Sequence, residues 1–277
     1  MTAFAETLEQ FRAAVSGPAA EVPLVRAALL VARAEYPALD IDAYEQRIGE
    51  LGRRLEARVH PADALASQLR AASALLFEEC GLRGDRETYG DPRNLYLNDV
   101  LDRGSGIPVS LAIVYVAVLR GAGLPADVVG LPGHVVVRAG GAEGVFVDPF
   151  EAGRVLSADD CRRLVRNVYG RRTPFREHHL EPITGRQTLA RVLQNLKAGY
   201  LQGGDEERAG RVIELLLALW PWDLDERRDR GMLRERLGEY GAALADLEAY
   251  VRYRGSARDI RTVDEAVRAL RRQIGAG

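Results

Sequence analysis

Residues 109–120 form an apolar run in which Ala112, Tyr115 and Leu119 recur at the spacing of one helix face. Pro108 stands at the start of this run, a favoured place for proline because the first N–H of a helix has no partner in any case. The pattern predicts a buried helix that begins near Pro108. The free N–H groups and the dipole at that end would favour a thiolate or an oxyanion.

A second pattern, rich in β-branched residues, predicts two strands joined by a Gly-rich turn. The first strand, the turn and the second strand are residues 134–138, 139–143 and 144–148. If the turn is centred on Gly141, Val137 faces Val145 and His134 faces Asp148, with Cβ atoms about 4.5–5.5 Å apart. A carboxylate beside an imidazole fixes the tautomer of the ring and stabilises its protonated form. We therefore expect His134 and Asp148 to form a pair.

The last third of the chain repeats itself at an offset of 34 residues. This offset superimposes Gly204 on Gly238, Ala209 on Ala243 and Glu214 on Glu248. It is the period of the tetratricopeptide repeat, and residues 237–244 carry the Leu-Gly-x-x-Tyr and small-residue pattern of that family. The segment resembles a short tetratricopeptide array that ends in a helix over residues 260–274. A generic helical cap is the alternative interpretation.

Three segments follow from the positions of the breaks. Residues 1–65 are expected to be helical, with breaks at Pro23, Pro37 and Pro61. Residues 66–185 would form a mixed core and residues 186–277 the helical repeat. Pro174, Pro182 and Gly185 mark the second boundary.

Several motifs of the middle segment resemble the SirB-type bacterial branch of the transglutaminase-like, papain-like superfamily. In chain order they are residues 89–101, 106–111, 130–134 and 148–150, which together span roughly the middle half of the chain. The resemblance implies an α+β fold in which a central helix packs on an antiparallel sheet. It also implies that His134 is the catalytic base and Asp148 the acid that orients it.

The sequence departs from the superfamily at the nucleophile. The position at which the helix of a transglutaminase-like protein carries its cysteine is Pro108 in this chain. Ser110 is the nearest hydroxyl, but two helical steps rotate a side chain by roughly 200°, so Ser110 should point away from that face. Without a nucleophile, His134 and Asp148 have a second interpretation, in which they only satisfy each other's hydrogen bonds in a partly covered cleft.

The two cysteines and two asparagines are weaker candidates. Cys80 and Cys161 are expected to be packing residues, although Cys161 follows a variant capping box and a helix N-terminus could lower its pKa. Asn94 and Asn98 precede the central helix and could donate hydrogen bonds into the same cleft as His134, or simply cap turns.

Composition excludes several classes of function. The chain has 277 residues, 47% hydrophobic and 28% charged, with a net charge of −2, which is typical of a globular protein and gives no basic field for nucleic acid. The arginine-rich residues 225–230 and 258–261 are interrupted by acidic residues and read as solvated faces with local ion pairs. Adjacent His178 and His179 lack the spacing of a zinc site, so no metal and no cofactor is expected.

The sequence also gives no sign of export or of a membrane. The N-terminus is acidic and lacks a signal peptide pattern, and no apolar run is long enough for a membrane span. Two distant cysteines form no disulfide framework, so a cytoplasmic location is expected.

Two functions remain open. The chain is either an interaction protein, in which the cleft near His134 binds a peptide or protein and the helical repeat recruits a partner, or a hydrolase or acyl transferase. In the second case His134 would be the general base, Asp148 would orient it, and water or Ser110 would attack.

Overall fold

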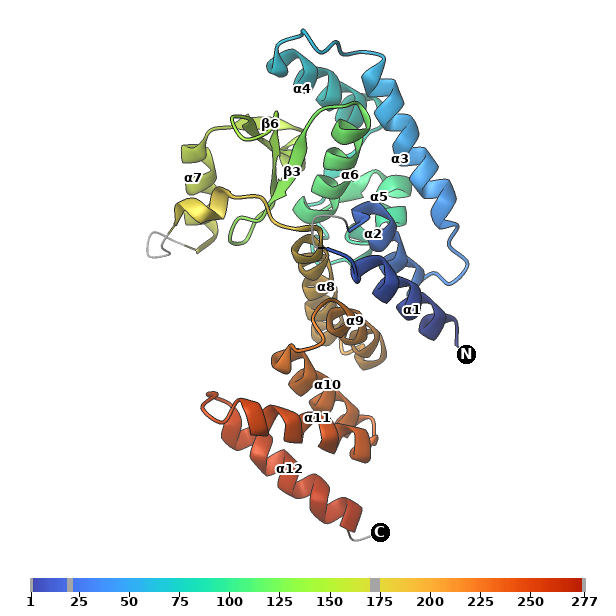
Figure 1. Ribbon diagram of the computed structural model, residues 1–277, viewed down its shortest axis with the longest axis vertical. Coiled ribbons are helices and arrows are strands. Elements are labelled where there is room, and N and C mark those ends of the chain that lie inside the picture. Colours follow the sequence, from blue (N-terminus) through green and yellow to red (C-terminus); the bar gives the residue numbers. More distant parts are fainter. Residues whose placement is uncertain (1, 19–21, 170–174, 276–277) are drawn as a thin grey trace. The chain divides into compact units, whose positions relative to one another are not determined.

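The computed structural model describes residues 2–18, 22–169 and 175–275, and its contacts divide the chain into two compact units, residues 1–195 and 196–277 (Figure 1). The N-terminal helices thus belong to the same unit as the core, and the division falls inside one helix, α8 (Gly185–Gln202). The segments expected from the sequence place the second boundary ten residues earlier. Of the residues that mark it, Pro174 lies outside the described part.

The N-terminal part of the first unit consists of helices that cover the core. They are α1 (Ala3–Val15), α2 (Leu24–Arg33), α3 (Ile41–Glu56), α4 (Leu65–Ser73) and a π-helical turn, η2 (Ala74–Glu79). Side chains of Thr2 and Asp40 cap α1 and α3 by accepting a backbone N–H. The backbone of α3 meets that of α6 (Pro108–Gly121) where Gly52 crosses Gly121, and a Cβ on Gly52 would lie 3.0 Å from the Gly121 Cα. Glycine permits this close crossing.

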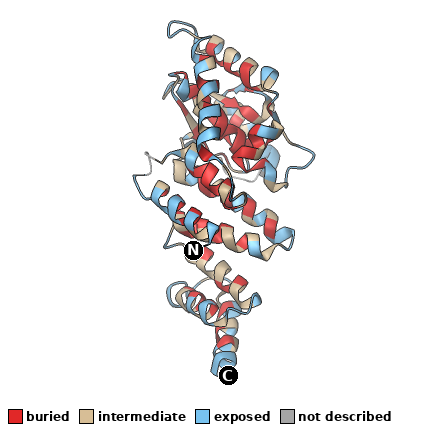
Figure 2. Ribbon diagram, turned by 90° about the vertical axis from the view of Figure 1, so that its right-hand side faces the viewer, coloured by how far each residue is buried: buried red, intermediate tan, exposed pale blue. Residues whose placement is uncertain are grey.

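The helix α6 is the centre of the first unit. Short elements precede it, namely β1 (Arg83–Gly84), η3 (Pro92–Asn94), α5 (Leu97–Arg103) and β2 (Ser105–Gly106), with β1 and β2 paired in parallel. Pro108 begins α6, as the sequence predicts, and almost every residue of the helix is buried. Figure 2 shows the buried residues concentrated in the interior of this unit, while the outer faces of its helices are exposed.

A four-stranded antiparallel sheet packs on α6. Its strands are β3 (Ala126–Val129), β4 (Val136–Ala139), β5 (Val145–Asp148) and β6 (Arg154–Leu156), hydrogen-bonded in that order. One face contacts α6 through β3 and β4, and the helix α7 (Ala158–Tyr169) packs on the other face through a cluster that includes Val136, Leu156 and Cys161. The 3₁₀ turns η4 (Pro149–Glu151) and η5 (Glu177–Leu180) complete the unit. The α+β class, with a central helix on an antiparallel sheet, is confirmed.

The predicted register of the hairpin is wrong, because each partner on the second strand lies two residues further along the chain than expected. Val137 pairs with Val147, and Val145 pairs with Ala139, so the turn is centred on Ala142. Gly140 and Gly141 both adopt left-handed backbone conformations, with φ of 89° and 78°, which moves the turn one residue along the chain. The strand also begins at Val136, which leaves His134 in the loop before it.

The second unit confirms the 34-residue period. It contains α9 (Glu206–Leu219), α10 (Leu224–Arg236), α11 (Tyr240–Tyr253) and α12 (Ile260–Gly275). The bounds of α9 and α11 differ by 34 at both ends, and Gly204 and Gly238 share a left-handed conformation before them. Ala209 and Ala243 are fully buried, as the small-residue pattern predicts.

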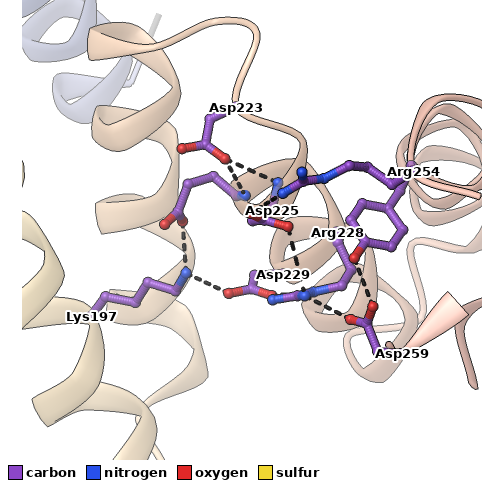
Figure 3. Close-up of polar contacts among 9 residues, drawn as sticks. Lys197, Asp223, Asp225, Arg228, Asp229, Arg254 and Asp259 are labelled. Atoms are coloured by element: carbon purple, nitrogen blue, oxygen red, sulfur yellow. Dashed lines mark hydrogen bonds and ion pairs between the residues drawn. The ribbon is translucent and has the colours of Figure 1, made fainter. Parts of the chain in front are cut away.

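A network of ion pairs joins the helices of this second unit (Figure 3). The Nζ of Lys197 on α8 lies 2.7 Å from the Glu226 carboxylate and also pairs with Asp229, both on α10. Arg228 pairs with Asp229 and, at 2.6 Å, with Asp259 before α12, and Asp259 accepts the hydroxyl of Tyr250. Residues 225–230 do form local ion pairs, and one partly buried pair, Arg228 with Asp259, joins this stretch to residues 258–261.

No helix in the described part of the chain combines the length and the apolarity needed to cross a bilayer.

Candidate functional site

Pro108 and His134 line one cleft of the first unit. The cleft has a volume of about 430 Å³, and its lining comes from the loop before η3, the start of α6 with the residue before it, the loop before β4 and the middle of α8. The lining residues are Tyr89, Ile107, Pro108, Val109, Pro132, Gly133, His134, Val135, Arg191, Gln194 and Asn195. Pro108, at the position where the resemblance leads us to expect a nucleophile, therefore lines the same space as the candidate base.

His134 and Asp148 are hydrogen-bonded, which confirms their expected proximity. The Nε2 of His134 lies 2.8 Å from Oδ2 of Asp148, and their side chains are 13% and 1% exposed. The other carboxylate oxygen of Asp148 accepts the N–H of Phe150 at 3.0 Å, which fixes the carboxylate at the start of η4. With Nε2 bound to the carboxylate, Nδ1 is the ring nitrogen left to accept a proton or a hydrogen bond.

Two further residues hold His134 in place. The ring of Phe150 meets the imidazole edge to face, with centroids 6.1 Å apart. Arg191 on α8 donates to the carbonyl oxygens of Leu131 at 3.0 Å and Gly130 at 2.9 Å, and so ties down the loop that carries His134. No motif in the sequence indicates Arg191, because it lies about sixty residues along the chain in the segment interpreted as the repeat.

Ser110 lies on α6 but outside the cleft. Its side chain is fully buried, its Oγ donates to the carbonyl of Asn94 at 2.6 Å, and it accepts the N–H of Ile107 at 3.1 Å. Within the described residues it makes no hydrogen bond to His134. The hydroxyl therefore caps the start of α6, and these bonds argue against Ser110 as a nucleophile.

Neither asparagine donates into the cleft. Asn94 is buried, and its amide donates to the Thr88 carbonyl at 2.7 Å and to Asp85 at 3.1 Å, so it organises the loop before η3. Hydrogen bonds from Thr88, supported by the one from Asn94, lower the pKa of Asp85 to about 2. Asn98 is buried on α5, and neither it nor Asn94 lines the cleft.

The cysteines do not supply a nucleophile to this cleft. Ser157 and Asp160 form the expected capping box before Cys161, with hydrogen bonds of 3.1 and 2.9 Å to each other's backbone N–H. Cys161 is fully buried, and burial raises the pKa of its thiol to about 12, which is opposite to the lowering that a helix N-terminus alone would cause. Cys80 lines a separate cavity of about 300 Å³ beside Arg47 and Arg54.

His178 and His179 lie on η5, where their rings meet edge to face with centroids 4.5 Å apart. They are on a different element from the cleft and take no part in it.

Comparison with known proteins gives two family matches. Residues 42–194 match the family model of the transglutaminase-like superfamily, and residues 196–268 match that of the tetratricopeptide repeat. A UPF0162 protein of Xylella fastidiosa (strain Temecula1) is 36% identical over 234 residues, which are 83% of each chain. A UPF0162 protein of Vibrio cholerae is 27% identical and covers 91% of this chain and 92% of its own. Human F-box only protein 21 is 28% identical over 169 residues, 55% of this chain and 25% of that protein.

Proposed function

The chain belongs to the transglutaminase-like superfamily and shares the UPF0162 branch with its bacterial relatives, and from this premise we propose that it is an interaction protein whose His134 cleft binds a peptide segment without reacting with it. The observation that carries this proposal is Pro108. It stands where the family resemblance places the nucleophile, lines the same cleft as His134, and has neither a hydroxyl nor a thiol.

No other lining residue replaces the missing nucleophile. Among the described residues of the lining, Tyr89 carries the one hydroxyl; it is 45% exposed, and partial burial of its phenol raises the pKa, which keeps it protonated and weakly nucleophilic at neutral pH. Ser110 is held by backbone groups and Cys161 is buried elsewhere. The proposal therefore makes the retained histidine a binding group.

The cleft is suited to an extended peptide. His134 presents Nδ1 and Gln194 adds a side-chain amide, while Asn195, whose amide nitrogen donates to the Arg191 carbonyl at 2.8 Å, adds a side-chain oxygen. Ile107, Val109 and Pro132 provide apolar wall between them. Such a mixture of polar and apolar groups is typical of sites that bind main-chain amides and a side chain together.

The tetratricopeptide unit supports the same reading, since helical repeats generally present extended surfaces to protein partners. We propose a protein partner rather than nucleic acid, because the net charge is −2. We place the function in the cytoplasm, since Cys80 and Cys161 are both free thiols. A protein that binds without catalysis would act by regulating its partner.

The test is peptide selection from a random display library on the full chain, followed by binding measurements with a blocked cleft. Gln194 is exposed and lines the cleft, so Gln194→Trp fills its mouth without disturbing the core. Ala198 is exposed on the same helix outside the lining, so Ala198→Trp is the matched control. We expect a class of peptides that loses binding to the first variant and keeps it to the second. Equal binding to both variants by every selected peptide would contradict a cleft site.

The contact between His134 and Asp148 favours one alternative, hydrolysis of an acyl substrate by water. The buried carboxylate fixes Nε2, which leaves Nδ1 in the cleft as a general base. This alternative requires turnover that depends on His134, which an assay with His134→Ala decides.

A further inference from the structure

A groove of about 780 Å³ lies on the second unit between α10, α11 and α12. Alanine and valine side chains form its floor, and charged and aromatic side chains form its rim. The floor consists of Ala245, Ala249, Val251 and Val267, and the rim of Arg227, Glu248, Arg252, Tyr253, Asp264 and Arg271. It shares no lining residue with the His134 cleft.

The carboxylates of the rim are already neutralised. Glu248 pairs with Arg271 at 2.7 Å, and Asp264 pairs with Arg268 one turn away on α12. Two arginines of the rim have no such partner. Arg227 donates to the carbonyl of Pro221 at 3.1 Å, and within the described residues it forms no ion pair. The groove therefore carries positive charge that its own acidic residues do not offset.

Arg252 is the second of these arginines. Its guanidinium lies over the ring of Tyr253, 5.9 Å from the centroid, and no described carboxylate contacts it. The ring itself is 66% exposed, so its apolar face is open to solvent beside the guanidinium. A cation stacked on an exposed aromatic ring offers a partner both charge and apolar surface.

Other arginines of the second unit are ion-paired within it, although Arg258, Arg261 and Arg272, like Arg227 and Arg252, form no ion pair among the described residues. Arg228, Arg230, Arg234 and Arg254 each pair with at least one carboxylate of the same unit. What sets Arg227 and Arg252 apart is that both line one groove beside an exposed ring and form no ion pair within the described residues, so their charge is available to a ligand.

We propose that this groove binds an acidic peptide segment of a partner protein, with spaced Asp or Glu side chains at Arg227 and Arg252 and one apolar residue on the floor. Glu248 and Asp264 remain on the rim, so separated carboxylates fit better than a continuous polyanion. This proposal rests on the interaction role proposed for the chain, and it adds the chemical class of segment that the tetratricopeptide unit would bind.

The experiment uses the full chain and the peptides selected from the random library. We expect one selected class to be enriched in Asp and Glu around an apolar residue. Binding of that class, measured by fluorescence anisotropy, should weaken at least about tenfold in Arg227→Glu/Arg252→Glu. It should weaken at least about threefold in Tyr253→Ala, which removes the exposed ring. Arg261→Glu is the control, because Arg261 is an exposed arginine outside the groove.

The outcomes separate this proposal from the one for the cleft. Acidic peptides that bind Gln194→Trp normally but fail on the double variant support the groove, whether or not any peptide uses the cleft. The proposal is overturned if no acidic class is selected, or if Arg261→Glu weakens binding as much as the double variant does. It is also overturned if single-stranded DNA displaces the peptides with higher affinity, because the groove would then bind a polyanion. Far-ultraviolet circular dichroism checks that each variant remains folded.

Discussion

Pro108 is the residue on which our proposal for the cleft depends. A proline at the first position of α6 has no N–H to lose and fits the helix start, so the helix can begin there without a nucleophilic side chain. The hydroxyl two positions later does not compensate, because Ser110 donates to Asn94 and accepts from Ile107. We therefore propose that His134 and Asp148 stand in a site that lacks the nucleophile they would activate.

The two cysteines should differ sharply in reactivity. Burial raises the pKa of Cys161 to about 12, so almost none of it is thiolate at pH 8. Cys80 is half-buried and lines a cavity. We expect iodoacetamide at pH 8 to modify Cys80 in the native protein and Cys161 only after unfolding in urea, as read by peptide mass spectrometry. Native labelling of both at the same rate would contradict the burial of Cys161.

The same thiol predicts a pH dependence of stability. An unfolded cysteine titrates near pH 8.5, at about its ordinary pKa, whereas folded Cys161 titrates at about 12. The contribution of Cys161 to the unfolding free energy is therefore complete below the pKa of the unfolded thiol, and it is lost as the pH rises from about 8.5 to about 12. We expect the unfolding free energy of Cys161→Ala to fall less steeply over that range than that of the unchanged chain. Parallel curves would contradict this assignment.

At the site, the sequence predicts which side chains come into contact better than it predicts the backbone register that brings them together. The pairing of His134 with Asp148 is found, yet the hairpin register used to argue it is wrong. The observed register shifts because two glycines take left-handed conformations, a choice that a run of Ala and Gly leaves undetermined. Arg191 could not be inferred, since its contacts are to carbonyl oxygens of a distant loop and leave no pattern of side-chain types.

Among the elements, the helices of the repeat are the most predictable. Their 34-residue period repeats small residues where helices approach closely, and α9 and α11 follow it. The start of α6 at Pro108 was also predictable from the proline itself. The grouping of α1–α4 with the core could not be predicted from the sequence, because it depends on contacts such as the crossing of α3 over α6 at Gly52 and Gly121.

The close packing of α10 on α11 should make the second unit sensitive to added volume at Gly231. A Cβ on Gly231 would lie 2.6 Å from the Leu247 side chain, whereas one on Gly241 would meet nothing within 4 Å. We expect Gly231→Ala to lower the unfolding free energy of the second unit by about 1–3 kcal/mol through overpacking. Gly241→Ala, the control, should leave it unchanged or slightly raised.

Tryptophan fluorescence during urea unfolding measures this, because Trp220 and Trp222 are the chain's two tryptophans and both lie in the second unit. Equal transitions for the two glycine variants would mean that α10 and α11 do not approach at Gly231.

At the scale of the whole molecule, the chain is two units whose division lies within α8. The first unit holds the cleft, and the second holds the repeat and its ion-pair network. Within the second unit, Lys197 on α8 holds Glu226 and Asp229 of α10. The network therefore fixes the C-terminal part of α8 to the repeat, and the other half of the same helix supplies Arg191 to the cleft.

Removal of Lys197 should destabilise the second unit. Burial raises the pKa of Glu226 because it disfavours the charged carboxylate. The ammonium group of Lys197 offsets this desolvation and stabilises the charged form. We expect Lys197→Met to lower the unfolding free energy by about 3 kcal/mol, which is the lower end of the loss when a buried ion pair loses one partner. Tryptophan fluorescence during urea unfolding measures this loss. Arg268→Met breaks an exposed pair on α12 and should cost less than about 0.5 kcal/mol. Similar losses in both variants would argue against a structural role for the network.

An acyl-donor assay, read by intact mass and product release, tests whether the His134 cleft binds peptides without reacting with them. Esters and glutamine peptides, with a primary amine as acceptor, would be given to the unchanged chain, His134→Ala and Pro108→Cys. The account predicts no adduct and no turnover in the first two, and a covalent acyl adduct in Pro108→Cys, whose new thiol faces the His134 cleft. Turnover by the unchanged chain that disappears in His134→Ala would contradict the account and establish a hydrolase.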